Sequence, residues 1–465
     1  MTTSRPAVLA GVAAAVAAVV VVLVIVLGGG SGASGKAPAS GAAHLVPADA
    51  LVYVHLSTDR DRSATASAAK VADAFPSWPA LRDGIVKRLQ APGCDLAAQA
   101  LKTANEAALA IFDTAGGKTA NSLVLVDTGK DHPGATQRGC GTLSSTYVGK
   151  FLAIGQPESL ALAQKLQNGE GASLADAALP KKAFAGLPAD RVADGWVSRD
   201  GVRRLLAPQG GLLGAVGVLF DQPALRGAAF GLSAADGRAH LVVKSQLDPK
   251  LARQSTSGFR KFTPTLAADV PASAMAYLGV SNVAPALQRI LAAAGSSSAQ
   301  LAPLVTQLAD PLKQVFPGEA AIVLTSAAPA PVLTIMGHAK DEAATRKTLA
   351  ALPAAVRKSF STAVFNGKVA VSTDPKGIAA VRAGGDHLPD SGQWSKTVGN
   401  HPQSVSSLLF LNFSRLLTLG EQTGLAQSKA YQAAKADLSQ VRAIGAYTSG
   451  SDSESTAEIS LLITS

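Results

Sequence analysis

The sequence predicts an α+β protein with an N-terminal transmembrane helix followed by two tandem, related units of mostly antiparallel sheet with helices on one side. The prediction rests on two observations. One strand pattern occurs twice, because Pro47 precedes Tyr53 by the same spacing that separates Pro271 from Tyr277, 224 residues further on. An uncharged apolar segment, residues 7–27, precedes both copies. An internal repeat of this size indicates a duplicated structural unit.

Further landmarks recur in the same order along the chain. Glu106-Ala107-Ala108 returns as Glu319-Ala320-Ala321, and Gly149-Lys150 followed by Pro157 returns as Gly367-Lys368 followed by Pro375. The offsets of 213 and 218 residues differ slightly, as loop insertions and deletions between packed elements would produce. We therefore expect repeat unit 1 at residues 44–250 and repeat unit 2 at 251–465.

Within unit 1, short β-branched runs predict strands and apolar residues at helical spacing predict helices. The expected strands are 51–56, 107–112, 122–126, 147–154, 188–197, 225–232 and 239–245. The expected helices are 66–75, 94–105, 157–166 and 200–206. Pro157 stands at the favoured first position of its helix, and Asp236-Gly237 predicts the turn of a hairpin. Unit 2 repeats this order and ends in strands at 442–447 and 456–463.

The N-terminal segments predict a single-pass membrane anchor. Residues 7–27 span about 30 Å as a helix at ~1.5 Å per residue, which matches a hydrocarbon core. Ala37-Pro38-Ala39 imitates a signal cleavage site, but the apolar run exceeds the ~7–15 residues of a secretory signal. Arg5 places residues 1–6 in the cytoplasm and the bulk of the chain outside the cell membrane. Residues 28–43 form a flexible Gly/Ser/Ala linker.

The two cysteines, Cys94 and Cys140, both fall in unit 1. Their counterparts in unit 2 are missing together, which favours a disulfide in an oxidising compartment. The alternative is a catalytic Cys140 with His132 as its base, although nothing in the sequence places the two side by side.

An apolar segment from residue 212 to residue 220 has a polar counterpart in unit 2 and is therefore a place where the copies diverge. Two interpretations stand: an apolar lid or groove for a lipid or hydrophobic peptide, or a helix buried between the two repeats. The residues of this possible ligand or interface segment are Leu212, Leu213, Val216, Val218, Leu219 and Phe220.

The sequence contains none of the catalytic or phosphate-loop motifs that would define an enzyme class. The seven histidines are dispersed without metal-ligand spacing, so we expect no catalytic residue, no metal site and no cofactor. The formal net charge is +10, from 42 basic and 32 acidic residues. Outside the cell this charge favours anionic lipids or acidic wall polymers as partners, and not nucleic acid.

The Pro-Ala-Asp-Ala opening at 47–50, ahead of Tyr53 and behind an anchor and a Gly/Ser linker, resembles a family of actinobacterial membrane-anchored exoproteins classed as a domain of unknown function. The two Gly-Lys-to-Pro segments are similar to that family too. The resemblance implies an exported, membrane-tethered protein and transfers no site residue. The function expected from the sequence is a non-enzymatic binding or scaffold protein of the cell envelope. The alternatives are a carrier or sensor of a lipid or other apolar ligand, and an unrecognised enzyme.

Overall fold

The structure is a computed structural model of the chain. It describes residues 37–38, 40–59, 61–89, 104–113, 120–134, 136–140, 143–206, 223–254, 260–281, 283, 314–327, 330–352 and 354–464. The chain divides into two compact units whose boundary lies between Ala252 and Arg253, two residues from the expected one. Residues 452–456 group with unit 1, whereas the rest of the C-terminal strands belong to unit 2.

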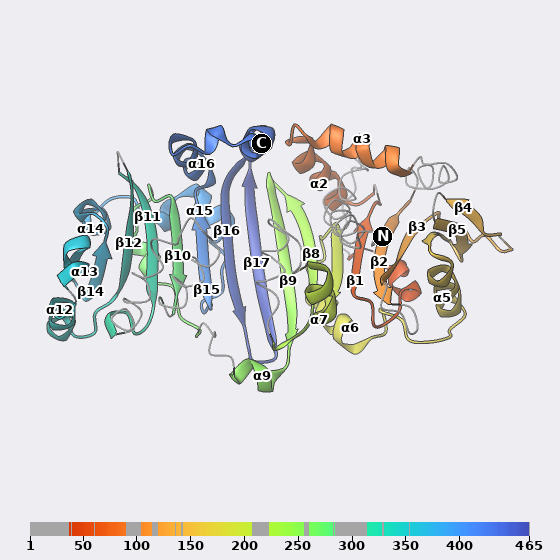
Figure 1. Ribbon diagram of the computed structural model, residues 1–465, viewed down its shortest axis with the longest axis horizontal. Helices are drawn as coiled ribbons and strands as arrows, with labels where there is room; N and C mark the ends of the chain where they lie inside the picture. The colour runs from red at the N-terminus through yellow and green to blue at the C-terminus, as the bar shows by residue number, and fades with distance from the viewer. Residues whose placement is uncertain are drawn as a thin grey trace, which may run out of the picture. The chain divides into compact units, whose positions relative to one another are not determined.

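Unit 1 is built on an antiparallel sheet (Figure 1). Its strands are β1 (Val52–Ser57), β2 (Glu106–Asp113), β3 (Ala120–Asp127), β4 (Arg138–Cys140), β5 (Leu143–Val148), β6 (Phe151–Gly155), β7 (Ala193–Ser198), β8 (Leu225–Ala235) and β9 (Arg238–Leu247). Hydrogen-bonded pairs place them in the order β4-β5-β6-β3-β2-β1-β7-β8-β9, with β1 between β2 and β7.

The helices of unit 1 precede or follow these strands. They are the 3₁₀-helix η1 (Gly41–Leu45), α2 (Ser63–Asp73), α3 (Trp78–Leu89), α5 (Pro157–Gln167), α6 (Ala178–Ala185), α7 (Arg199–Gly201), the π-helical turn η2 (Val202–Leu206) and α9 (Pro249–Gln254). Pro157 begins α5, as predicted. Asp236 and Gly237 both have positive φ and form the predicted turn between β8 and β9.

Unit 2 contains its own series of strands and helices. The strands are β10 (Ala276–Val280), β11 (Ala320–Ala327), β12 (Ala330–His338), β13 (Ser361–Phe365), β14 (Lys368–Ser372), β15 (Ser407–Leu411), β16 (Val441–Gly450) and β17 (Glu454–Ile463). The helices are η3 (Leu266–Asp269), α12 (Glu342–Ala350), α13 (Ala354–Ser359), α14 (Pro375–Arg382), η5 (Leu388–Asp390), α15 (Gly392–Thr397), α16 (Phe413–Gln422), η6 (Leu425–Gln427) and α17 (Lys429–Leu438).

The two units share one strand order. In unit 2 the antiparallel pairs give β13-β14-β12-β11-β10-β15-β16, which repeats β5-β6-β3-β2-β1-β7-β8 of unit 1. The registers agree as well. Tyr53 is paired with Ala110 and Tyr277 with Val323, and these two partners are 213 residues apart, the same offset as between Glu106 and Glu319. The repeated Pro-to-Tyr pattern therefore marks the central strand of two sheets with the same topology.

One sequence match between the copies is out of register by one residue. The two-residue turn between β5 and β6 is Gly149-Lys150, whereas the turn between β13 and β14 is Asn366-Gly367. Lys368 therefore occupies the position of Phe151, and not that of Lys150. The two Gly-Lys pairs are identical in sequence but occupy different positions in their hairpins. Because a shift of one residue along a strand exchanges its two faces, equivalent letters here do not mean equivalent side-chain environments.

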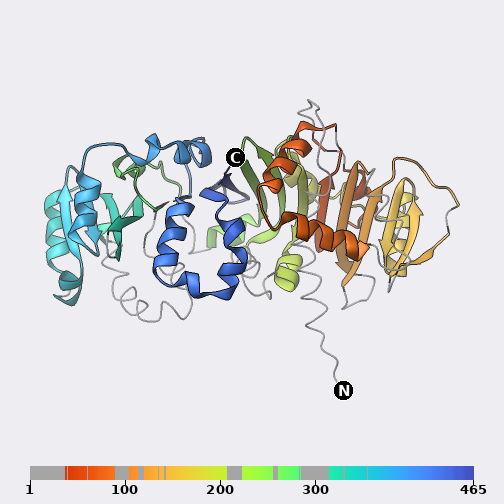
Figure 2. The ribbon, with the colours of Figure 1, turned by 90° about the horizontal axis from the view of Figure 1, so that it is seen from above.

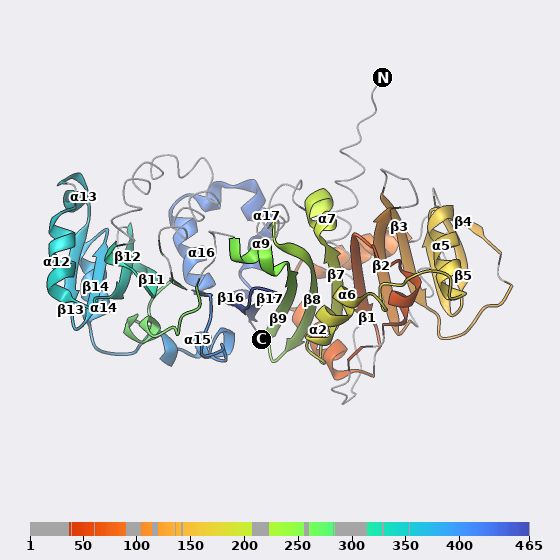
Figure 3. The same ribbon diagram turned by 90° about the horizontal axis from the view of Figure 1, so that it is seen from below.

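The expectation that helices lie on one side of each sheet is wrong. In unit 1, α2 packs its alanines against Ala234 of β8, whereas α6 joins the core cluster that contains Ala229 of the same strand. Residues five apart on a strand point to opposite faces, so the two helices cover opposite faces. Figures 2 and 3 show the unit from both sides, with α2 and α3 in red and orange and α6 in yellow-green. In unit 2, α12 packs with Ile322 and α14 with the neighbouring Val323.

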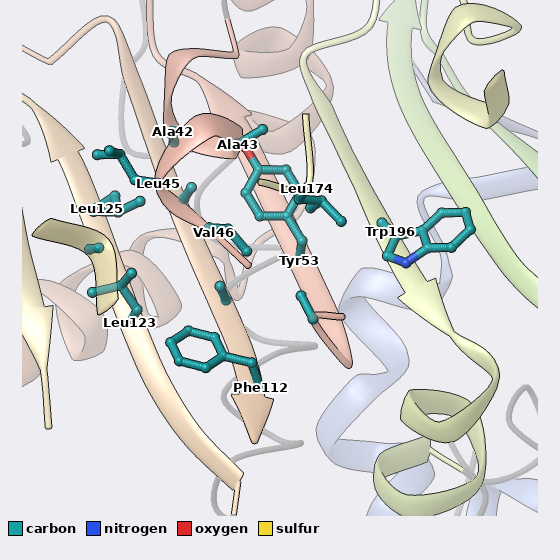
Figure 4. Packing of buried hydrophobic residues seen from close by; sticks show 14 of the residues in the cluster. Ala42, Ala43, Leu45, Val46, Tyr53, Phe112, Leu123, Leu125, Leu174 and Trp196 are labelled. Atoms are coloured by element: carbon teal, nitrogen blue, oxygen red, sulfur yellow. The ribbon is translucent and has the colours of Figure 1, made fainter. Parts of the chain in front are cut away.

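The largest core cluster of unit 1 lies between η1, α5, α6 and the strands. Tyr53 of β1, Phe112 of β2 and Trp196 of β7 contribute the large side chains, surrounded by smaller aliphatic ones (Figure 4). Trp78, Trp196 and Trp394 are all buried.

Several further predictions need correction or lie outside the description. The linker expected at 28–43 ends before Gly41, because Gly41–Leu45 form η1 and Ala42 and Ala43 are buried. The strand expected at 147–154 is the hairpin of β5 and β6, because Gly149 adopts positive φ and turns the chain. The strand expected at 188–197 starts only at β7, residue 193. The transmembrane segment 7–27 and the helix at 94–105, except for its last two residues, lie outside the described residues. No helix within the described part of the chain is long and apolar enough to span a membrane.

Candidate functional site

Two groups of polar side chains stand out, a closed cluster in unit 1 and an open pocket in unit 2. The closed cluster is centred on His55 of β1, which lies opposite Asp194 of β7 in the strand register. The His55 Nδ1 and Asp194 Oδ1 atoms are 3.2 Å apart, and Arg191 donates from Nε to Asp194 Oδ2 at 2.6 Å. His55 and Asp194 have side chains that are 0% and 1% exposed.

Glu106, at the start of β2, completes this cluster and also caps a helix. Its carboxylate accepts hydrogen bonds from the backbone N–H groups of Gly41 (3.0 Å) and Ala42 (2.6 Å) at the start of η1. These N–H groups have no partner within the helix, so an acceptor there stabilises its first turn. His55 Nε2 lies 3.9 Å from the same carboxylate.

The charges of the closed cluster shift one another's pKa values. Burial lowers the pKa of His55, but Asp194, by charge and hydrogen bond, and Glu106 raise it by more, so it lies above its ordinary value. Burial raises the pKa of Asp194, yet His55 and Arg191 bring it below its ordinary value. Burial also raises the pKa of Glu106 above its ordinary value. His55 and Asp194 therefore stabilise each other's charged form in a site that solvent does not reach, whereas burial disfavours the charged form of Glu106.

Unit 2 repeats the cap without the closed cluster. Glu319, the counterpart of Glu106, accepts from the backbone N–H groups of Thr265 (2.7 Å) and Leu266 (3.0 Å) at η3. His338 Nε2 lies 3.1 Å from Glu319 and comes from β12, a different strand from that of His55 in unit 1. A glutamate cap present in both units belongs to the scaffold, whatever the units bind.

The open pocket lies in unit 2, beside the β13–β14 hairpin and the C-terminal end of α14. Its volume is about 450 Å³. Its lining residues are Asp269, Phe365, Asn366, Lys368, Val381, Arg382, Ala383, Gly384 and His387. Lys368 Nζ forms an ion pair with Asp269 Oδ1, and the Arg382 guanidinium lies 4.4 Å from the centre of the Phe365 ring. The pocket therefore combines two permanent cations with one carboxylate.

The corresponding place in unit 1 is filled by core. The shared Val-Pro sequence makes Leu45 the counterpart of Asp269, and the hairpin register makes Phe151 the counterpart of Lys368. Leu45 and Phe151 are 2% and 4% exposed and belong to one hydrophobic cluster. Their neighbour Ala163 on α5, the counterpart of Val381, belongs to the same cluster. One copy is thus closed by apolar packing where the other has a polar, solvent-facing pocket.

Most of the site residues predicted from the sequence lie outside the described residues. Cys94 and the apolar segment 212–220 lie outside the described residues, and Cys140 is the last residue of β4, so the disulfide stays a prediction. His132 contacts Thr128, at 3.2 Å, and stacks on Tyr147, with ring centres 3.9 Å apart. Within the described part of the chain, no three His, Cys, Asp or Glu side chains are placed to hold a metal ion.

Sequence reasoning missed both polar groups. His55 and Asp194 are 139 residues apart, and no local pattern connects them. The pocket did leave a signal, since a charged Asp269 replaces an apolar Leu45 immediately before the repeated Val-Pro. A position-by-position comparison of the two copies at this point would have found it.

Comparison with known proteins assigns no family. No family model matches the chain, and no curated protein matches it. The solved structure titled "Structure of crystal form I of TP0453" has 10% sequence identity and a TM-score of 0.27, and the match covers 49% of this chain and 89% of that chain. Crystal form IV gives 10% identity and a TM-score of 0.26, over 44% of this chain and 79% of that chain. Crystal form III gives 9% identity and a TM-score of 0.26, over 48% and 89%.

Proposed function

We propose that this protein is a non-enzymatic binding protein of the cell envelope, in which unit 2 carries the binding site and unit 1 is a closed relative of the same fold. One observation carries the proposal. At equivalent positions of the two copies, unit 1 has the buried Leu45 and Phe151, whereas unit 2 has Asp269 and Lys368 in a pocket of about 450 Å³. An open polar pocket at a place that its copy fills with core supports a binding role for unit 2.

The closed cluster of unit 1 favours a structural role over a catalytic one. A general acid or base must come within hydrogen-bond distance of the group it protonates or deprotonates. His55, Asp194 and Glu106 have side chains that are at most 1% exposed, and they are occupied with one another and with η1. These side chains therefore hold β1 in place between its neighbouring strands.

The sequence supports a setting in the cell envelope. Residues 7–27 are proposed as the membrane anchor and residues 28–40 as its linker, because Gly41 already begins η1. Together they would hold the folded part of the chain near the outer membrane face. The net charge of +10 favours acidic components of that environment, either anionic lipids or acidic wall polymers. The resemblance to membrane-anchored exoproteins supports the same setting.

Site-specific photocrosslinking in intact cells tests the proposal. A photoreactive residue replaces Ala383, which is exposed and lines the pocket, or its counterpart Lys165, which is exposed on α5 of unit 1. We expect a crosslinked envelope adduct from position 383 and none from position 165, because the buried Leu45 and Phe151 fill the equivalent place in unit 1. Equal labelling at both positions, or no adduct at 383, would contradict a binding role for unit 2.

A further inference from the structure

We infer that the pocket of unit 2 binds a phosphate group, held by Arg382 together with Lys368 and His387. This inference rests on the proposed function, because it names the chemistry of the same site. A phosphate group occurs both in anionic lipid head groups and in phosphate-containing wall polymers, and the experiment below separates these two sources.

Arg382 supplies the free cation of the pocket. Its guanidinium is exposed and stacks on the face of Phe365 at 4.4 Å, and it forms no ion pair with any residue that the structure describes. Stacking fixes the plane of the guanidinium and leaves its N–H edges open. Those edges match the spacing of two phosphate oxygens, which makes a bidentate contact possible.

Lys368 and Asp269 form a pair that a ligand can reorganise. Their side chains are 24% and 26% exposed, so the ion pair is half-buried and still accessible from the pocket. A phosphate oxygen would share the Lys368 ammonium with Asp269, and the two anions would repel each other. Asp269 therefore weakens phosphate binding without preventing it, which gives the inference a directional test.

His387 carries a polar atom in need of a partner. It lines the pocket, and its Nδ1 atom is buried with no hydrogen-bond partner among the described residues. A buried polar atom without a partner is unfavourable. Because Nδ1 is buried, a phosphate in the pocket would reach it only if the His387 ring turned toward the pocket, and that turn would remove the penalty. The counterpart in unit 1 is Ser173, placed by the matching bridges of Pro47 with Ser173 and Pro271 with His387. The histidine is therefore particular to the unit with the pocket.

Two features of the surroundings oppose an anion. The C-terminal end of α14 at Arg382 carries the negative end of the helix dipole. Asp390 lies near His387, but its Oδ2 atom already accepts a hydrogen bond at 3.0 Å from the backbone N–H of His387. The opposite hypothesis is a cation site at Asp269, and the two hypotheses predict opposite effects of the same substitutions.

The test measures binding of glycerol phosphate and inorganic phosphate to the full-length chain, purified in detergent, by titration calorimetry. We expect Arg382→Gln to weaken binding roughly tenfold or more, through loss of charged hydrogen bonds. We expect Asp269→Asn to strengthen binding, because it frees Lys368. Lys376→Gln, which removes an exposed charge of the same helix outside the pocket, should change affinity less than about twofold at physiological salt, because screening weakens distant charges.

Each outcome decides the inference. If Asp269→Asn weakens and Arg382→Gln strengthens binding of a divalent cation such as Mg²⁺, with no phosphate bound, the pocket is a cation site and the inference is wrong. Equal binding of acetate and phosphate overturns it as well, since a general anion site needs no phosphate. A crosslink at position 383 without phosphate binding leaves the proposed function standing and removes only this inference.

Two further probes identify the source of the phosphate. Vesicles of phosphatidylglycerol are compared with vesicles of phosphatidylcholine, and soluble poly(glycerol phosphate) is tested separately. Sedimentation with the phosphatidylglycerol vesicles that is lost in Arg382→Gln points to a lipid head group. Binding of the soluble polymer with the same dependence on Arg382 points to the wall. If wild type and Arg382→Gln bind every probe alike, the pocket is not the phosphate site.

Discussion

The central strands of the two units have the same place in the same sheet but different neighbours. In unit 1, His55 of β1 faces Asp194 across the strand pair, and Tyr53 stacks parallel to the His55 ring at 6.4 Å between centres. In unit 2, Gly279 stands at the position of His55 and Leu408 at that of Asp194. The same fold is therefore compatible with a charged centre in one copy and an apolar centre in the other.

Gly279 explains how unit 2 fills the space that His55 occupies in unit 1. A Cβ atom added to Gly279 would lie 2.8 Å from the Tyr277 hydroxyl and 3.2 Å from its ring, so the tyrosine fills the space that a side chain would need. Tyr277 also packs edge-on against Trp394, with ring centres 5.5 Å apart. An aromatic side chain and a glycine thus replace the polar cluster. The polar cluster is therefore one way to fill the centre of the sheet, and not a requirement of the fold.

The largest effect is expected from breaking the charge balance of unit 1. Asp194→Leu leaves Arg191 and His55 buried without their carboxylate, and we expect it to lower the free energy of unfolding by about 3–5 kcal/mol. The variant that adds His55→Gly and Arg191→Val copies unit 2, where Gly279 and Val405 stand, and should recover most of this loss. Urea unfolding of both variants measures the difference.

The control is Leu408→Ala in unit 2, which deletes apolar volume without stranding a charge. It should lower the free energy of unfolding by about 2–5 kcal/mol, with no dependence on the unit 1 substitutions. If the triple variant of unit 1 is as unstable as Asp194→Leu alone, the two centres are not interchangeable and the comparison fails.

A second, smaller effect concerns the fit between β7 and β8. A Cβ atom on Gly227 would lie 2.3 Å from the Trp196 ring. In unit 2 the smaller Phe410 stands at the position of Trp196, and the buried Ala443 stands at the position of Gly227. Gly227→Ala alone should therefore destabilise by about 1–3 kcal/mol through overpacking. Trp196→Phe in the same chain should remove the clash, so that the double variant is more stable than the sum of the two single changes.

A double-mutant cycle by urea unfolding checks this expectation. An interaction free energy of about 1 kcal/mol or more in favour of the double variant supports it. Additive effects would mean that β8 moves away from the indole, and that the two units do not match at this strand pair.

Local chemistry made part of the fold predictable from the sequence. The Asp236-Gly237 turn, the helix starts at Pro157 and Pro375 and the duplication itself depend on residues that are close in sequence or identical in both copies. The predicted hairpins were enough to predict antiparallel sheets. They did not predict that helices cover both faces of each sheet. An amphipathic helix shows that it packs on a sheet, but its sequence does not say on which face.

The candidate site was out of reach for a different reason. Matching Gly149-Lys150 with Gly367-Lys368 placed the two lysines together, while the turns show that Lys368 replaces the buried Phe151. The identical Gly-Lys pairs suggested this alignment. The Asn366-Gly367 pair, which is a strong signal for a two-residue turn, indicates the correct one. The pocket combines residues from three separate elements, namely Asp269, Lys368 and Arg382. No spacing along the sequence therefore predicts it.

The smallest expected effect is the pH dependence that the histidine gives to unit 1. The pKa of His55 is raised in the folded state, so its stabilising contribution is complete below the unfolded pKa of about 6.5 and is lost as the pH rises through the folded value. Between those two values the folded chain holds a proton that the unfolded chain has released. The free energy of unfolding should therefore fall with pH, by at most about 1.4 kcal/mol per pH unit.

Urea unfolding between pH 6 and pH 8, for the wild type and for His55→Gln, measures this slope. Burial also raises the pKa of Glu106, so this residue makes the free energy of unfolding fall with pH as well, starting from its ordinary pKa near 4.5. The pKa of Asp194 is lowered, so its stabilising contribution is complete above its ordinary pKa and is lost as the pH falls through its folded value. The histidine is the group among these three whose unfolded pKa lies in the measured range. His55→Gln should be less stable at pH 6 and should lack the histidine's part of the slope. An unchanged slope in this variant would show that folding does not shift the pKa of His55. A wild-type stability that rises with pH relative to His55→Gln would show that His55 is neutral in the folded state, and that its contact with Asp194 is a hydrogen bond between a neutral ring and a carboxylate rather than an ion pair.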